Sequence, residues 1–121
     1  MDGTSNSYRM FISDGLLDAS IDAIRECSLQ TRRYESIHTT IRYACGLILA
    51  QQRGVGDIHN FLSACQLEGS HRIHLNVDRR WKDEFLTASD MLNTAAGAEL
   101  KPLQRFAVLV RYIRFDPKGG Q

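Results

Sequence analysis

The sequence predicts a mainly α-helical protein with about five helices and one or two short β-strands. Hydrophobic residues make up 43% of the chain and charged residues 24%, which is typical of soluble globular proteins. Over most of the chain the hydrophobic residues recur at steps of three and four, which indicates amphipathic helices, and one segment clearly alternates like a strand. At 121 residues, the chain is long enough for one core. We expect a single compact domain over residues 1–121, with a helical half at 1–70 and a strand–helix–helix half at 71–116.

The first two helices are predicted from hydrophobic spacing and from capping residues. One should span residues 15 to about 30, with Asp14 as its N-cap. The next should span residues 35 to about 52, with Gly54 as its C-terminal stop. Residues 43–50 of this helix are hydrophobic on nearly all sides. We therefore expect them to be buried between helices of the chain or at a dimer contact.

A third, shorter helix is expected after Asp57, and the hydrophobic period then changes. Asp57 is a suitable N-cap for this helix, and Gly69 is a suitable end. Residues 72–77 alternate strictly between polar and hydrophobic side chains, which predicts a strand with one buried face. A shorter alternation near the N-terminus also precedes two helices, so the strand–helix–helix order could be repeated; its hydrophobic members are Tyr8, Met10 and Ile12.

Two further helices follow the alternating segment. Asp78 is expected to cap the first of them, which carries a hydrophobic stripe and ends at Gly97. Pro102 is expected to open the second, because a first helical turn leaves its N–H groups unpaired and proline has none. Pro117 should end that helix.

The sequence carries no motif for catalysis, metal binding or membrane insertion. Its three cysteines and four histidines form no CxxC, HxxxH or similar chelating pair, and there is no nucleophile elbow or phosphate loop. The longest hydrophobic run is far shorter than the roughly 20 residues of a membrane helix, and the N-terminus does not have the pattern of a signal peptide. We expect a cytoplasmic protein with reduced thiols, which is not an enzyme and has no cofactor or metal.

The alternating segment and the residues after it offer a surface for nucleic acid. Arg72, His74 and Asn76 share the polar face of the predicted strand. Arginine and asparagine can make bidentate contacts to guanine and adenine edges, and a two-stranded ribbon fits the major groove. Basic side chains that could reach phosphates follow directly: Arg79, Arg80 and Lys82. These six residues are the candidate DNA-binding site.

In this pattern and order of elements, residues 72–115 resemble a ribbon-helix-helix unit. The ribbon would be RIHLNVD, the first helix residues 79–96, the turn Gly97, and the second helix residues 100–115. The resemblance implies a dimer intertwined through its second helices. It also implies a ribbon in the major groove, read by Arg72, His74 and Asn76, and a second helix whose start touches phosphate.

Several features differ from that family pattern. The unit lies at the C-terminal end, its first helix is about one turn too long, and its second helix has no Ser or Thr cap. Glu99 also lies near the amides that should meet a phosphate, where its charge would repel it. In a tandem version, residues 8–12 would supply the other strand and make a pseudo-dimer within one chain.

Two function classes follow from these observations. The first is a small dimeric DNA-binding regulator; residues 71–121 carry nine basic and six acidic side chains, against six and eight in residues 1–70. The second is a helical protein–protein interaction module, such as an adaptor, an anti-activator or an inhibitor. It is suggested by residues 43–50 together with Leu109, Tyr112 and Phe115, which we expect to offer more hydrophobic surface than a small bundle can bury. Either could be a homodimer.

Overall fold

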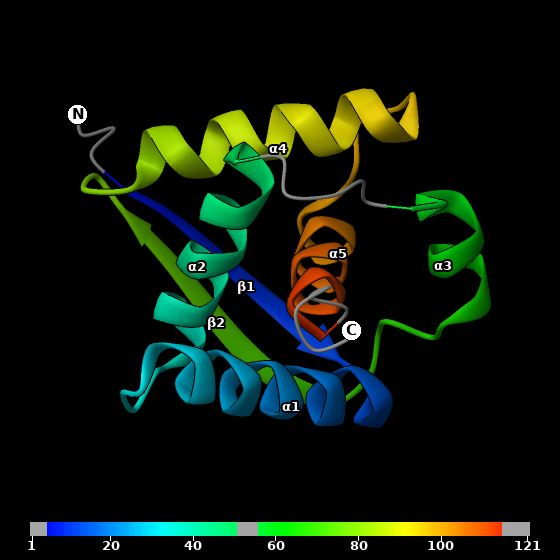
Figure 1. Cartoon of the computed structure of the whole chain (residues 1–121). Helices are drawn as coiled ribbons and strands as arrows, with labels where there is room; N and C mark the ends of the chain where they lie inside the picture. Colours follow the sequence, from blue (N-terminus) through cyan, green and yellow to red (C-terminus); the bar gives the residue numbers. More distant parts are fainter. Residues whose placement is uncertain (1–4, 51–55, 115–121) are drawn as a thin grey trace.

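The computed structural model describes residues 5–50 and 56–114, which form five helices and a two-stranded antiparallel sheet (Figure 1). The protein is mainly α-helical, as predicted. The elements in chain order are β1 (Ser5–Ile12), α1 (Asp14–Thr31), α2 (Ile37–Leu49), α3 (Ile58–Ala64), β2 (His71–Asp78), α4 (Lys82–Ala96) and α5 (Pro102–Arg114). The alternation near the N-terminus is therefore a strand. Within the described residues, no helix has the length and hydrophobicity needed to span a membrane.

The two strands form an antiparallel ribbon within one chain. Their register runs from Ser5 opposite Asp78 to Ile12 opposite His71. In Figure 1 the ribbon passes behind α2 and α5, while α1 and α4 lie along opposite sides of the molecule. One face of the ribbon is part of the hydrophobic core, which includes Met10, Ile12, Leu75 and Val77. The alternation seen in the sequence therefore places every second side chain of each strand against the helices.

The two strand–helix–helix units repeat at a spacing of 65 residues. Ile37–Leu49 of α2 and Pro102–Arg114 of α5 differ by 65 at both ends, and α1 and α4 end at Thr31 and Ala96. The buried positions of α1 also recur 65 residues later; these pairs are Leu16 with Trp81, Ser20 with Phe85, Ala23 with Ala88, and Cys27 with Leu92. The same spacing relates Met10 to Leu75 and Ile12 to Val77 on the ribbon. The suspected repeat is therefore present in the structure, although few of the residue types agree.

The helices of the two units are interleaved. α1 packs mainly on α5 and α2 mainly on α4, so each first helix lies against the second helix of the other unit. The second helices α2 and α5 also contact each other, α2 contacts β2, and α5 contacts β1. Because these contacts cross between the units, neither unit has a complete core of its own.

The segment between the units is attached to the end of β1. Downstream of α3, the carbonyl of Leu67 accepts a hydrogen bond from the N–H of Ser13 at 2.8 Å. The N–H of Gly69 donates to the carbonyl of Phe11 at 3.2 Å. Together with a bridge between Ile12 and Glu68, these bonds continue the pairing of β1 beyond the start of β2, so the segment between the units is fixed to the ribbon.

The starts of α1 and α2 differ from those expected. Ser13, not Asp14, is the N-cap of α1: its hydroxyl accepts a hydrogen bond from the N–H of Leu16 at 3.1 Å and donates one to the carbonyl of Gln66 at 2.7 Å. α2 begins at Ile37 instead of residue 35, because Ser36 and Thr39 form a capping box. It ends at Leu49, before the expected residue 52, and Gly54 lies outside the described residues.

Three other boundaries also need correction. Asp57 caps α3 as predicted, but the helix ends at Ala64, well before Gly69, because the chain turns there to pair with β1. Asp78 does not cap α4: its carboxylate accepts a hydrogen bond from the N–H of Arg80 at 2.9 Å, within a turn at residues 79–81, and the helix begins at Lys82. The other predicted stop, Pro117, lies outside the described residues.

The hydrophobic surface expected around residues 43–50 is largely covered. Ala44, Cys45 and Ile48 are buried between helices, while Leu47 and Tyr43 are half-buried. Leu109 is 1% exposed and Tyr112 is 4% exposed. The expectation of excess hydrophobic surface here was wrong because the interleaved helices enclose α2 and α5 from several sides; Phe115 lies outside the described residues.

Candidate nucleic-acid interface

The outer face of the ribbon carries three exposed side chains from each strand. Arg72, His74 and Asn76 are exposed on β2, as predicted. They are paired in register with exposed residues of β1: Phe11 opposite Arg72, Arg9 opposite His74, and Ser7 opposite Asn76. The face opposite the hydrophobic core is therefore a strip of six side chains, which we call the ribbon face.

The polar groups of the ribbon face differ in whether they have a partner within the chain. Ser7 donates a hydrogen bond to the side-chain oxygen of Asn76 at 3.0 Å, which ties the two strands at one end. Within the described residues, the guanidinium groups of Arg9 and Arg72 have no hydrogen bond or ion pair. Phe11, which is 50% exposed, places a hydrophobic ring beside Arg72. The ribbon face therefore combines cationic, amide and hydrophobic groups.

The three basic residues predicted to follow the strand are placed differently from one another. Arg79 and Arg80 are exposed in the turn at the Asp78 end of the ribbon. Lys82 is only partly exposed at the start of α4 and has an interaction within the chain, so it is not a free cation at the ribbon. Arg80 donates to the carboxylate of Asp78 at 3.0 Å. Hydrogen bonds from its side chain and backbone lower the pKa of Asp78 and keep that carboxylate ionised.

The start of α2 lies beside this end of the ribbon. Together they line a hollow of about 320 Å³ whose walls include His38, Thr39, Arg42, Asn76 and Arg80. Arg42 is also 3.6 Å from the carboxylate of Glu84 on α4. Basic and hydrogen-bonding groups from three elements therefore gather next to Asn76, at the edge of the ribbon face.

The opposite end of the ribbon has a different charge pattern. The Nε2 atom of His71 is 2.5 Å from a carboxylate oxygen of Asp14, the first residue of α1. His71 and His74 are three positions apart, so they lie on opposite sides of the strand, and only His74 belongs to the ribbon face. Asp14 thus follows β1, whereas Arg79 and Arg80 follow β2.

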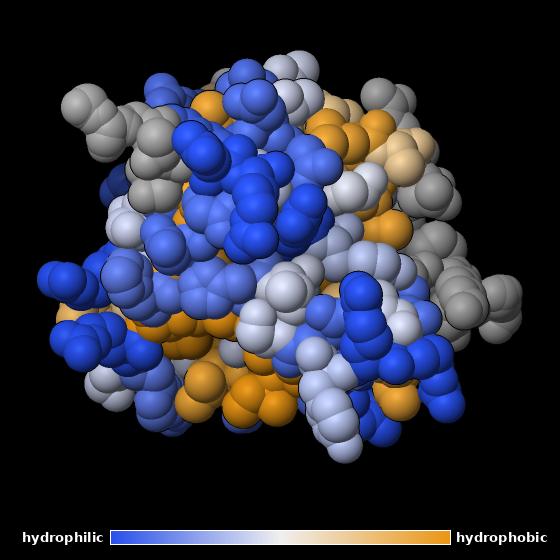
Figure 2. All heavy atoms as spheres, turned by 90° about the vertical axis from the view of Figure 1, so that its left-hand side faces the viewer, coloured by the Kyte–Doolittle hydropathy of each residue, from blue (hydrophilic) through white to orange (hydrophobic). Residues whose placement is uncertain are grey.

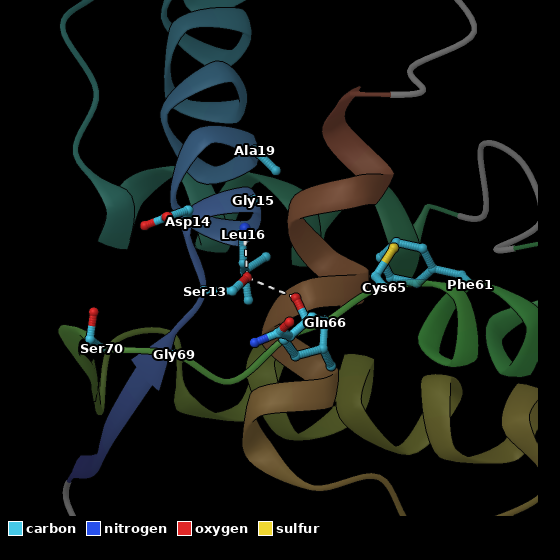
Figure 3. A pocket seen from close by; sticks show the side chains of 11 residues that line it. Ser13, Asp14, Gly15, Leu16, Ala19, Phe61, Cys65, Gln66, Gly69 and Ser70 are labelled. Carbon is cyan, nitrogen blue, oxygen red and sulfur yellow. Dashed lines mark hydrogen bonds between the residues drawn. The ribbon is translucent and has the colours of Figure 1, made fainter.

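A hollow of about 540 Å³ lies next to this acidic end, between the start of α1 and the segment after α3 (Figure 3). Figure 3 shows the hydroxyl of Ser13 between the backbone of Leu16 and the carbonyl of Gln66, with Cys65 and Phe61 on the other side. Ser13 is already bonded on both sides, and the carboxylate of Asp14, which also lines the hollow, is bonded to His71. We interpret the hollow as a feature of the junction between β1 and α1.

The cysteines differ in their environments. Cys27 and Cys45 are buried in the helical core, and burial raises the pKa of both thiols, that of Cys45 to about 12. Cys65 is exposed beside the segment that pairs with the end of β1. In the part of the chain that the structure describes, no three histidine, cysteine or acidic residues are grouped so that they could hold a metal ion.

The side of the molecule seen in Figure 2, which is the left-hand side of Figure 1, is mostly covered by hydrophilic residues, with smaller hydrophobic areas between them. In the described parts of the chain, five large hydrophobic side chains are exposed: Phe11, Ile21, Leu29, Tyr34 and Leu86. Leu29 and Tyr34 line a hollow of about 470 Å³ at the end of α1, together with Arg25, Arg32 and Arg33.

The β2 half of the ribbon face was predicted from the sequence, whereas Ser7, Arg9 and Phe11 on β1 were not. The signal for these residues was the alternation of Tyr8, Met10 and Ile12, since exposed side chains must lie between buried ones in a strand. Comparison of the chain with protein-family models, with curated proteins and with solved structures gave no significant match.

Proposed function

We propose that this chain is a non-enzymatic DNA-binding protein that reads the major groove with the ribbon face. The observation that carries the proposal is the exposed strip formed by Arg9, Arg72, His74 and Asn76, together with Ser7 and Phe11, on the side of the ribbon away from the helices. An antiparallel ribbon fits the major groove, where arginine and asparagine can form bidentate hydrogen bonds to guanine and adenine. DNA contacts would also give partners to Arg9 and Arg72, which have none among the residues that the structure describes.

The arrangement of the helices supports the same proposal. In a ribbon-helix-helix dimer, two strands pair across two intertwined subunits, and here the equivalent pairing and intertwining occur within one chain. This corresponds to the tandem version of the resemblance. A complete ribbon face then needs only one copy of the chain, while a homodimer of such chains stays a prediction.

The charges next to the ribbon face favour phosphate contacts at one end. Arg79 and Arg80 are exposed in the turn after β2, and the start of α2 lies beside them. Asp78 offsets part of this positive charge through its bond to Arg80. Because the chain has a net charge of only +1, we propose that a local basic end, not overall charge, supplies the electrostatic attraction to DNA.

Fluorescence anisotropy with a labelled pool of random-sequence duplexes tests the proposal. Binding should weaken steeply as salt is raised, because phosphate contacts release counterions. The Arg72→Ala/His74→Ala/Asn76→Ala variant should lose affinity for a selected sequence roughly tenfold or more, since a bidentate base contact contributes about 1–3 kcal/mol.

A matched control separates the ribbon face from general charge. Arg72→Ala and Arg25→Ala each remove one exposed arginine, but Arg25 lies on α1 and is not part of the ribbon face. Circular dichroism should show both variants folded, and only Arg72→Ala should weaken binding to the selected sequence. Equal affinities for the two variants, or no DNA binding at low salt, would contradict the proposal.

The second candidate is the helical interaction module. Residues 43–50 no longer favour it, because they are largely covered. The surface that favours it is at the end of α1, where Leu29 and Tyr34 are exposed and line a hollow together with three arginines. A Leu29→Ser/Tyr34→Ser variant with unchanged DNA affinity would separate this surface from the ribbon face. If the wild-type chain fails to bind any duplex, this surface becomes the one to study with candidate acidic protein partners.

A further inference from the structure

The two strands present different chemistry at equivalent positions of the ribbon. The register pairs Arg9 with His74 at the middle of the ribbon face, and these two residues are 65 positions apart, the spacing that relates the helical units. The local two-fold relation between the units then makes Ser7 equivalent to Arg72 and Phe11 equivalent to Asn76. In all three equivalent pairs the chemical class of the side chain differs: hydroxyl and guanidinium, guanidinium and imidazole, aromatic ring and amide.

The residues that follow the strands differ in the same way. The position 65 residues after Asp14 is Arg79, and the next pair is Gly15 and Arg80. Asp14 is bonded to His71 at one end of the ribbon, while Arg79 and Arg80 are exposed at the other end. The Arg79–Arg80 end should therefore attract a phosphate backbone more strongly than the other end, where Asp14 adds a negative charge.

A symmetric dimer reads the same bases with both halves, so its sites are palindromic. A single chain with two different halves has no such constraint. Arginine prefers guanine, asparagine prefers adenine, and a hydrophobic ring can contact the methyl group of thymine, so each half of this ribbon face favours different base pairs. We infer that the chain binds a non-palindromic duplex in one orientation, with the Arg79–Arg80 end on a fixed side of the site. This inference rests on the proposed DNA-binding function.

The exposed thiol gives a direct way to read the orientation. Cys65 is the exposed one of the three cysteines and lies near the Phe11 end of the ribbon, because the following residues pair with Phe11 and Ser13. An iron–EDTA group attached to Cys65 through its thiol should cut DNA close to that end of the bound chain. The Cys65→Ser variant keeps Cys27 and Cys45 buried and is the control for cleavage from any other attachment.

The probe is a duplex that carries the sequence selected from a randomised pool. Cleavage should fall on one side of the selected sequence, and the sequence itself should not be palindromic. Cleavage of equal strength on both sides, or selection of a palindrome, would overturn the inference while leaving DNA binding intact. Failure to bind any duplex would instead overturn the proposed function, and the inference with it.

A second variant tests the cause of the asymmetry. Ser7→Arg/Arg9→His/Phe11→Asn gives the outer face of β1 the same side chains as Arg72, His74 and Asn76 on β2, and all three changed positions are exposed. Selection with this variant should yield a sequence closer to a palindrome than the wild-type one, and cleavage from Cys65 should become more nearly two-sided. An unchanged selected sequence would contradict the assignment of these residues as readers.

Discussion

Arg32 and Gly97 end the first helices of the two units in the same backbone conformation. Arg32 has φ of 61° and Gly97 has φ of 70°, and both form the C-cap of their helix. The left-handed conformation costs a residue with a Cβ roughly 1–2 kcal/mol, but glycine adopts it readily. The two units thus form the same turn with different residues. Gly97 suits the left-handed conformation of this turn, whereas Arg32 does not.

Arg32→Gly should therefore stabilise the protein. The relief of strain exceeds the greater chain entropy of glycine in the unfolded state, so we expect the free energy of unfolding to rise by about 0.5–1 kcal/mol. Urea unfolding followed by circular dichroism measures this change. The control is Arg32→Ala, which also removes the guanidinium but keeps the strained φ and should give no such gain. Equal stabilities for the two variants would show that the backbone strain is not the cause.

At the scale of elements, the junction of β1 with the segment after α3 depends on a close approach of two backbones. A Cβ at Gly69 would lie 2.5 Å from the carbonyl oxygen of Ile12 and 2.5 Å from the Cα of Ser13. Both neighbours are backbone atoms held by the ribbon and by the start of α1, so they cannot move aside easily. The junction therefore requires glycine because of this contact.

Gly69→Ala should destabilise the protein, because the added methyl group forces the two backbones apart. We expect a loss of about 1–3 kcal/mol in the free energy of unfolding, the usual cost of overpacking. Ser70→Ala is a suitable control, since Ser70 is exposed next to the same junction. Hydrogen exchange should also become faster at the N–H of Ser13, which bonds to Leu67. Equal stability of the two variants would mean that the junction is more adaptable than its geometry indicates.

The elements that sequence could predict are those whose signals are local. Strict alternation predicted β2, and a shorter alternation suggested β1, but neither pattern carries information about which strand pairs with which. For that reason Arg72, His74 and Asn76 were found and Ser7, Arg9 and Phe11 were not. The cap of α1 was misassigned because Ser13 and Asp14 are both good caps. Only the fold supplies the carbonyl of Gln66 that binds the Ser13 hydroxyl.

At the scale of the whole molecule, both strands of the ribbon and the interleaved helices that support it belong to one chain. An obligate dimer unfolds at a temperature that rises with protein concentration, because association and folding are coupled. For this chain we expect the midpoint of thermal unfolding to stay the same when the concentration is varied widely. Sedimentation equilibrium under the same conditions gives the mass for comparison with the 13.7 kDa of one chain.

The same coupling predicts the stoichiometry on DNA. If one chain supplies a complete ribbon face, titration at concentrations well above the dissociation constant should reach saturation at one chain per selected duplex. A midpoint that rises with concentration, together with two chains per duplex, would place the functional ribbon in a dimer. The pairing of β1 with β2 inside one chain favours one chain per duplex. Exchange of β2 between two copies would break the strand pairing that runs from Ser5–Asp78 to Ile12–His71. It would also break the contacts that α4 and α5 make with α1 and α2.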